Sequence, residues 1–257
     1  MMTQHEFFEV EISDGIAQLA MNLPPLNVLN NAMMAEFNLI LGPLVKNSEL
    51  AAIVIKGKGK AFSAGVDVSD HSADKVAAMI ENFHGIFRNL ASTDALTIAV
   101  VQGAALAGGC ELACFCDIVL ASDRAKFGQP EVQVGVFPPV AAAVFPLMVG
   151  LHKAIELNAL GAVIRADEAK QLGLVQHVFS ADEFDTEVEE YLDTIRHLSR
   201  PVVRLAKRAT VLNSRDAILS HLERVEKIYL GELMKLADAH EGIAAFMDKR
   251  TPEWTHT

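Results

Sequence analysis

Strands and helices alternate along the first half of this sequence, and that order limits the fold more than any other feature. Alternating apolar and polar residues at 8–12 and 16–21 flank an Asp-Gly turn, which predicts a β-hairpin. A helix follows, with Asn30 or Asn31 as its N-cap. Buried strands are then expected at 51–55, 96–101 and 118–121, and helices at 74–90 and 109–116. This order indicates βαβ units, so we expect an α/β fold with parallel pairing and right-handed crossovers.

The second half of the sequence is mostly helical. Helical patterns are found at 151–160, 166–172, 181–198, 201–212, 216–236 and 239–248, with one short strand at 175–179. We therefore expect an α/β body at residues 1–190, which holds the functional site, and a helical region at 191–257. No internal repeat, low-complexity segment or linker is visible.

The composition excludes several classes of protein. Hydrophobic residues make up 51% of the 257 residues, which is enough for a sizeable core and excludes a disordered chain. A net charge of −11 argues against nucleic-acid binding, which depends on clustered Lys and Arg. Residues 1–11 do not resemble a signal peptide, and Gly, Gln and Pro interrupt the apolar stretch at 132–150, so no membrane span is expected. We expect a soluble, cytoplasmic protein.

The three cysteines lie close together in the sequence. Cys110 and Cys114 share a helix face, and Cys116 points elsewhere. No further Cys or His stands at ligand spacing, so small buried side chains of a reduced core are favoured over a zinc site. No metal is expected.

Two glycine-rich loops follow buried strands, at 60–67 and 102–111. Ligands bind beyond the carboxyl ends of strands in open α/β sheets, so both loops are well placed for a site. Gly108 and Gly109 open a helix, whose free N–H groups suit an oxygen that gains negative charge. The alternative interpretation is that the glycines merely permit tight turns. Neither loop is a P-loop or a dinucleotide-binding loop.

Two glutamates stand out near these loops. Glu111 lies in the first turn of the expected helix, among apolar neighbours, and Glu131 follows twenty residues later, after Pro130. Burial raises the pKa of a carboxyl group and favours acid/base chemistry. The residues by themselves indicate a possible carboxylate pair.

Three segments resemble motifs of the crotonase (enoyl-CoA hydratase) superfamily. Residues 61–67 read AFSAGVD and resemble its AFSAGxD loop. Residues 107–113 (AGGCELA) and 127–131 (FGQPE) resemble its GGGCELA…FGQPE block. Residues 246–254 (FMDKRTPEW) resemble its C-terminal FxxKRxPxW tail. The resemblance covers essentially the whole chain.

The resemblance implies a crotonase (ClpP/crotonase-like) fold of repeated ββα units, with C-terminal helices that mediate trimerisation. It implies a homotrimer or a dimer of trimers that binds an acyl-CoA thioester and water, with coenzyme A as part of the substrate and no other cofactor. The backbone N–H groups of Val66 and Gly108 would form the oxyanion hole for the thioester oxygen. In hydratases of this superfamily both glutamates are present; we assign activation of water to Glu111 and proton exchange with carbon to Glu131, and the two can titrate as a coupled pair.

The resemblance also implies coenzyme A contacts. The carbonyl of Ala64 would meet the adenine, within a binding loop that includes Gly65 and Asp67. Lys60, and Lys249 in the C-terminal region, are candidates for the phosphates, with solvated surface lysines as the alternative.

The sequence departs from common short-chain hydratases after Glu131. Their glycine-rich PGxGGTQRL stretch is replaced by GVFPPVAAAVFP, so Phe137 and Pro139 would form a more apolar pocket wall. This stretch, the segment at 229–234 and the C-terminal tail look most like hydratases that convert cyclohexa-1,5-diene-1-carbonyl-CoA to 6-hydroxycyclohex-1-ene-1-carbonyl-CoA in anaerobic benzoyl-CoA (aromatic) degradation.

Other functions remain open from the sequence. A general 2-enoyl-CoA or cyclohex-1-ene-1-carbonyl-CoA hydratase is the nearest alternative, and an enoyl-CoA isomerase or a non-catalytic acyl-CoA binder is a weaker one. Some crotonase homologues bind RNA, but the basic residues at 204–208 form only a weak basic helix on an acidic chain. His71 and His84 would lie near the acyl pocket, without an assigned role.

Overall fold

The computed structural model describes residues 2–257, so Met1, the first residue of the expected body, lies outside the described residues. The larger of two sheets has seven strands in the order β1-β2-β3-β4-β6-β8-β11. Their bounds are Met2–Gln4, Phe8–Ser13, Ile16–Met21, Ala52–Gly57, Leu96–Val101, Ile118–Ser122 and His177–Phe179. The smaller sheet has the order β10-β9-β7-β5, with bounds Val163–Arg165, Lys126–Gly128, Ala104–Leu106 and Ala61–Ser63.

The expected hairpin and parallel pairing are confirmed. β2 and β3 pair antiparallel, and from β3 onward the neighbours β4, β6, β8 and β11 all pair parallel. Asn30 is the N-cap of α1 (Asn31–Lys46), where its side chain accepts the N–H of Met33. Local sequence signals therefore placed these elements correctly.

The chain repeats one unit three times: a strand of the large sheet, a strand of the small sheet, then a helix. The helices of these units are α2 (Val76–Ser92) after β4 and β5, α3 (Gly108–Phe115) after β6 and β7, and α4 (Pro139–Met148) after β8 and β9. The repeated ββα fold that the resemblance implied is thus confirmed. The sequence hides the repeat because the second strand of each unit has only three residues.

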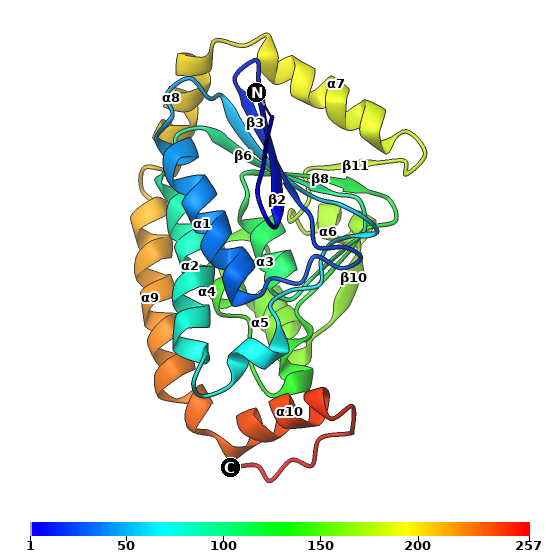
Figure 1. Cartoon of the computed structure of the whole chain (residues 1–257), viewed down its shortest axis with the longest axis vertical. Helices are drawn as coiled ribbons and strands as arrows, with labels where there is room; N and C mark the ends of the chain where they lie inside the picture. The colour runs from blue at the N-terminus through cyan, green and yellow to red at the C-terminus, as the bar shows by residue number, and fades with distance from the viewer. Residues whose placement is uncertain (1) are drawn as a thin grey trace.

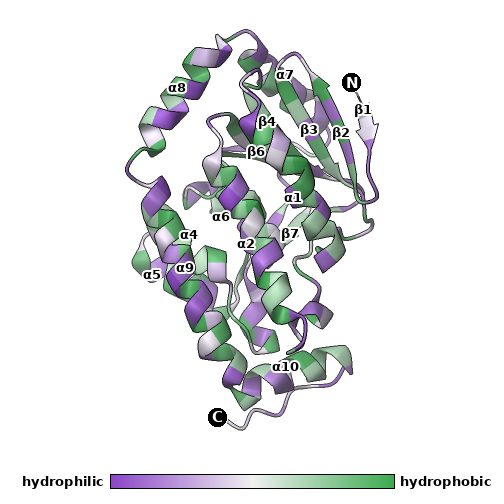
Figure 2. Cartoon of the chain, turned by 60° about the vertical axis from the view of Figure 1, so that its left-hand side comes forward, coloured by the Kyte–Doolittle hydropathy of each residue, from purple (hydrophilic) through white to green (hydrophobic). Residues whose placement is uncertain are grey.

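The remaining helices follow α4 and cover the body (Figure 1). They are α5 (Leu151–Leu160), α6 (Ala166–Gln171), α7 (Phe184–Arg196), α8 (Arg200–Val211), α9 (Arg215–Gly231) and α10 (Ala237–Met247). The long helix α9 lies along α2 and α4, and α10 crosses the end of the molecule beside the C-terminus. In Figure 2, α8 and α9 carry hydrophilic and hydrophobic residues along their length. The helix α9 buries Leu222, Val225 and Tyr229 against the body, whereas the buried residue of α8 is Lys207. The division at residue 190 stays a prediction.

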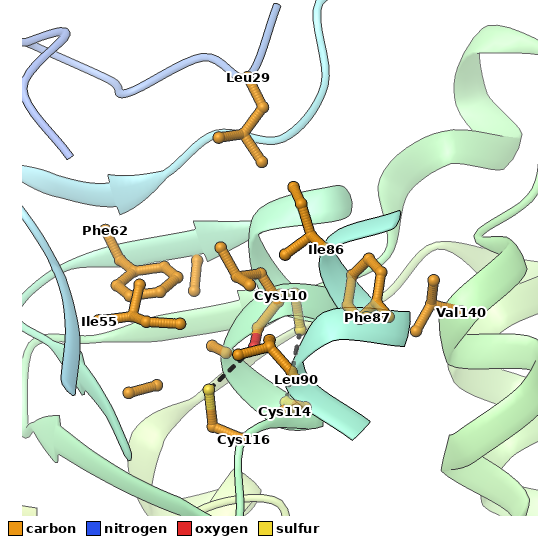
Figure 3. Packing of buried hydrophobic residues seen from close by; sticks show 14 of the residues in the cluster. Leu29, Ile55, Phe62, Ile86, Phe87, Leu90, Cys110, Cys114, Cys116 and Val140 are labelled. Atoms are coloured by element: carbon orange, nitrogen blue, oxygen red, sulfur yellow. Dashed lines mark hydrogen bonds between the residues drawn. The ribbon is translucent and has the colours of Figure 1, made fainter. Parts of the chain in front are cut away.

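The core lies between the large sheet and the helices, and the cysteines belong to it (Figure 3). Cys110, Cys114 and Cys116 are all buried. The Sγ atoms of Cys110 and Cys114 are 3.9 Å apart, whereas the Cys116 thiol points to the carbonyl of Leu112. No group of three or more His, Cys, Asp or Glu side chains within residues 2–257 is placed to hold a metal ion.

Four expectations about elements were wrong. β5 and β7 lie inside the glycine-rich stretches that we expected to be loops, and β9 and β10 were missed, because three-residue strands carry too little periodicity. The helix α4 was missed within the apolar stretch 132–150, where prolines obscured the helical pattern. The expected helix 216–236 ends at Gly231, and a 3₁₀ turn (Leu233–Lys235) follows. None of the helices in residues 2–257 has the length and hydrophobicity needed to cross a bilayer.

Candidate active site

A cavity of about 400 Å³ lies at the edge of the small sheet, where segments from across the chain meet. Its walls come from residues 64–71, from α2 and the first turns of α3 and α4, and from a 3₁₀ turn at Pro130–Val134, while Tyr229 of α9 and Phe246 of α10 complete it. Glu111 and Glu131 line the cavity, and most of the other lining side chains are apolar. None of the lining residues is Lys or Arg.

The two glycine-rich stretches pack directly against each other. Their strands β5 and β7 pair parallel, and a Cβ added to Gly109 would lie only 2.4 Å from the carbonyl oxygen of Ser63. Gly65 has φ +101°, and a Cβ there would lie 2.7 Å from the Cβ of Ala107. Both positions therefore require glycine, one for the close approach and the other also for its backbone conformation.

This packing places two free backbone donors at the cavity. Val66 and Gly108 both line it, and no acceptor for either N–H is found within residues 2–257. Gly108 is the first residue of α3, where an unpaired N–H is expected. The preceding residue, Ala107, has φ +50°, an uncommon value for a residue with a side chain. Such strain is typical of backbone held in place by its surroundings.

Glu111 is buried, and the protein binds one of its oxygens. Oε1 accepts the N–H of Val140 at 2.7 Å and that of Ala141 at 2.8 Å, both in the first turn of α4. The two preceding residues, Pro138 and Pro139, have no N–H, so these are the first donors that the helix offers. Burial raises the pKa of Glu111 to about 7, although the two backbone N–H groups oppose this shift. Glu111 is therefore suited to proton transfer near neutral pH.

Glu131 stands in the 3₁₀ turn opposite, surrounded by protein and partly accessible from the cavity. Burial raises its pKa well above the usual range, and the neighbouring Glu111 carboxylate raises it further. The buried amide of Gln129, with its nitrogen toward Glu131, donates to Glu131 Oε1 at 3.0 Å and to the Ala107 carbonyl at 3.2 Å. Burial and the Glu111 charge therefore both favour the protonated form of Glu131, while Glu111 can exchange a proton near neutral pH.

The structure brings most of the predicted site residues to this cavity. Besides the two glutamates, the lining includes Val66, Gly108, Ala64, Phe137 and Pro139.

Four predicted residues do not line the cavity. Gly65 shapes the loop, and the Asp67 side chain caps a short 3₁₀ helix (Val68–His71) by accepting the N–H of Ser69 at 2.9 Å. Lys60 and Lys249 are exposed and are not among the lining residues.

Several cavity residues were not predicted from the sequence. Met79, Ile80 and Phe83 lie within the expected helix 74–90, which was given no role in the site, and in the structure they line the cavity. Tyr229 lies almost a hundred residues after Glu131; the segment 229–234 carried part of the resemblance, but Tyr229 was given no role in the site. Its ring packs edge-on against Phe137, with centroids 5.2 Å apart.

The two histidines have different surroundings. His71 lines the cavity, and its Nδ1 lies 3.1 Å from the carbonyl of Asp67; burial lowers its pKa, so it is neutral near pH 7. His84 lies outside the lining, where its Nδ1 is 2.8 Å from Glu226 Oε2 on α9. Only His71 is placed to meet a ligand in the cavity.

Comparisons with known proteins agree with this geometry. The sequence matches the enoyl-CoA hydratase/isomerase family over residues 11–257. A probable enoyl-CoA hydratase of Mycobacterium bovis is 36% identical over 255 residues, which cover 98% of this chain and 99% of the relative. The cyclohexa-1,5-dienecarbonyl-CoA hydratase of Thauera aromatica is 33% identical over 245 residues, 95% of each chain. The crystal structure of an enoyl-CoA hydratase from Mycobacterium avium subsp. paratuberculosis K-10 superposes with a TM-score of 0.87 at 28% identity, covering 97% of this chain and 98% of that one. The chain therefore belongs to the enoyl-CoA hydratase/isomerase family of the crotonase superfamily.

Proposed function

We propose that this protein is a hydratase that adds water to the carbon–carbon double bond of an unsaturated acyl-CoA thioester. The observation that carries the proposal is the pair of glutamates in one largely apolar cavity, where burial raises the pKa of Glu111 to about 7 and that of Glu131 well above its usual range. One carboxylate that accepts a proton and one carboxylic acid that donates a proton are what hydration of an alkene requires. The separate environments of the two groups divide these roles between them.

In this proposal the free N–H groups of Val66 and Gly108 bind the thioester oxygen. That oxygen gains negative charge when water attacks the conjugated double bond, because the electron pair moves into an enolate. Two donors already aimed at the oxygen stabilise this charge without reorganising, and the loss of one such donor costs about 3 kcal/mol in other enzymes.

Glu111 acts as the base and Glu131 as the acid. Water donates a proton to Glu111 while its oxygen bonds to the β-carbon, and Glu131 delivers its proton to a carbon of the enolate. The pKa of about 7 leaves Glu111 partly ionised at neutral pH, and burial together with the Glu111 charge raises the pKa of Glu131 and favours its protonated form. The reverse reaction exchanges the two roles.

The acyl group that we favour is cyclohexa-1,5-diene-1-carbonyl, with 6-hydroxycyclohex-1-ene-1-carbonyl-CoA as the product. Phe83, Phe137 and Tyr229 line the cavity, and aromatic walls suit a flat ring; the named Thauera aromatica relative supports this choice. A place in benzoyl-CoA degradation would follow from it. Since none of the lining residues is Lys or Arg, an acyl chain with a distal carboxylate is disfavoured.

A general 2-enoyl-CoA hydratase is the second candidate, because the Mycobacterium bovis relative is 36% identical and carries that broader name. RNA binding is disfavoured by the contacts of the basic residues in α8. Arg204 donates to the carbonyls of Asn47 and Leu50, and Lys207 pairs with Asp117 at 2.6 Å in a buried position. These two cations are not free for phosphates.

Coenzyme A contacts and assembly are part of the same proposal. Ala64 would accept the adenine amino group on its carbonyl, with Lys60 and Lys249 near the phosphates. A homotrimer or dimer of trimers would cover the apolar side chains Val202 and Leu205 of α8, which are 61% and 51% exposed.

The test is water addition to cyclohexa-1,5-diene-1-carbonyl-CoA beside crotonyl-CoA, comparing kcat/KM, with Glu111→Gln and Glu131→Gln as matched variants. A preference for the cyclic diene that both variants lose supports the specific proposal. Turnover of crotonyl-CoA without turnover of the cyclic diene would contradict the specific substrate and support a general 2-enoyl-CoA hydratase. Incorporation of ¹⁸O from labelled water separates hydration from isomerisation, and no turnover of either thioester contradicts the proposal.

A further inference from the structure

The hydroxyl of Tyr229 is a third polar group at the candidate site. Tyr229 is only 1% exposed and lines the same cavity as the two glutamates. No side chain or backbone group within residues 2–257 forms a hydrogen bond with its hydroxyl, yet this oxygen is not sealed inside the protein. Buried tyrosine hydroxyls usually have a partner. A group in the cavity is thus the expected partner.

The surroundings of Tyr229 keep its proton in place. Burial raises the pKa of the phenol, and the carboxylates of Glu111 and Glu131 raise it further. Tyr229 lines the same cavity as both glutamates, and it enters the site as a hydrogen-bond donor. An apolar residue would have filled this wall equally well if packing were the only requirement.

Tyr229 is held by a contact of its ring and by contacts of the helix turn that carries it. The ring contact is the edge-on packing against Phe137, at an interplanar angle of 67°. The helix contacts involve Glu226, which lies three residues earlier on α9, where it binds His84 Nδ1 and Arg88 Nη2 of α2, each at 2.8 Å. Because residues three apart share a helix face, these bonds hold the α9 turn that carries Tyr229 against α2. The phenol is thus held in place before any ligand binds.

We propose that Tyr229 is a catalytic residue whose hydroxyl donates a hydrogen bond to the oxygen that is added to the substrate. This inference rests on the proposed hydratase function. The attacking water gives one proton to Glu111 and keeps the other, and one of its two lone pairs forms the bond to carbon. The second lone pair accepts the hydrogen bond from Tyr229. The phenol keeps its own proton throughout, so the step balances without a further reactant.

In the proposed mechanism the N–H groups of Val66 and Gly108 bind the thioester oxygen. The oxygen that is added to the substrate is therefore the remaining acceptor for the Tyr229 hydroxyl. The hydrogen bond persists in the product, because the new hydroxyl group retains a lone pair facing the phenol. A hydroxyacyl-CoA should therefore form a hydrogen bond with Tyr229, whereas a saturated acyl-CoA, which has no oxygen at that carbon, should not. This difference separates a catalytic contact from a packing role.

The experiment compares Tyr229→Phe with Tyr191→Phe, since these are the two tyrosines of the chain and Tyr191 lies on α7 outside the cavity lining. Hydration of the better of the two thioesters is measured first. Tyr229→Phe is expected to lower kcat by about 10- to 100-fold with a change of less than about threefold in KM, and Tyr191→Phe to leave both unchanged.

Binding is measured second, in the Glu111→Gln background so that turnover does not interfere. In this background, Tyr229→Phe is expected to weaken the binding of 3-hydroxybutyryl-CoA about 5- to 10-fold and to leave the binding of butyryl-CoA unchanged. Equal weakening of both ligands would mean that Tyr229 only packs, and would overturn the inference. Unchanged kcat and unchanged binding in an active enzyme would overturn it too, while leaving the hydratase function intact. A wild-type protein that hydrates neither thioester overturns both.

Discussion

The carboxylate of Glu111 is bound to the first turn of α4, where Oε1 accepts the N–H of Ala141 at 2.8 Å. This contact orients the carboxylate, but the backbone donors do not compensate for its burial, because the pKa of Glu111 is still raised from 4.5 to about 7. The ionised, buried carboxylate of Glu111 therefore lowers the stability of the folded protein at neutral and alkaline pH.

We predict that Glu111→Gln stabilises the protein at alkaline pH. The folded protein keeps a proton on Glu111 between pH 4.5 and about 7, whereas the unfolded chain releases it, so the stability contributed by Glu111 is lost as the pH rises through this window. Glutamine retains an acceptor for the two N–H groups and has no charge to bury. The gain in unfolding free energy over wild type should grow by up to about 3 kcal/mol between about pH 5 and about pH 8. Glu81→Gln, at an exposed position of α2, is the control. Equal pH dependence of the two variants in urea unfolding would contradict the argument.

The rate of hydration should depend on pH in two limbs. Activity rises as Glu111 loses its proton, with a midpoint at about 7, and falls at higher pH as Glu131 loses its own. The limbs report macroscopic values of the pair, because the two carboxyls interact. The measurement is kcat from about pH 5.5 to about pH 9.5, with activity reassayed at neutral pH to exclude denaturation. A flat profile through neutral pH would remove Glu111 as the base.

Gly109→Ala should destabilise the protein by about 1–3 kcal/mol, because the added methyl group meets backbone that cannot move away. Its Cβ would lie 2.4 Å from Ser63 O and 2.7 Å from Ser63 Cβ. The matched control is Gly42→Ala in α1, where nothing lies within 4 Å. There alanine should stabilise the helix by up to about 1 kcal/mol. Thermal unfolding that shows the same sign for both variants would refute the proposed contact between the glycine-rich stretches.

Glu226→Ala should cost about 1–3 kcal/mol of unfolding free energy, because it leaves the buried His84 Nδ1 and the Arg88 guanidinium without their common partner. Glu223→Ala, an exposed position on the same helix, should have little effect. Denaturant unfolding of both variants at neutral pH makes the comparison. Similar losses in the two would mean that helix propensity, and not the link between α9 and α2, sets the result.

Much of the fold was predictable where a signal is local. The hairpin, the N-cap at Asn30 and the strand at Leu96–Val101 follow from spacing over a few residues. The short strands of the small sheet were not predictable, because three residues acquire strand structure only when a neighbouring strand pairs with them. The helix after Pro138 was missed for a related reason: its first turn is stabilised by an acceptor, Glu111, that lies 29 residues earlier.

The candidate site divides in the same way. The sequence by itself determined the functional residues that lie in motifs, namely Glu111, Glu131 and the glycines of the two loops. These residues could be identified because their type and their spacing along the chain are visible in the sequence. The tertiary structure alone decided that Tyr229 lines the same cavity as these glutamates, that Glu111 binds α4, and that Lys60 and Lys249 are not among the lining residues. Burial and proximity set pKa values and hydrogen-bond partners, and both arise from contacts between segments far apart in the chain.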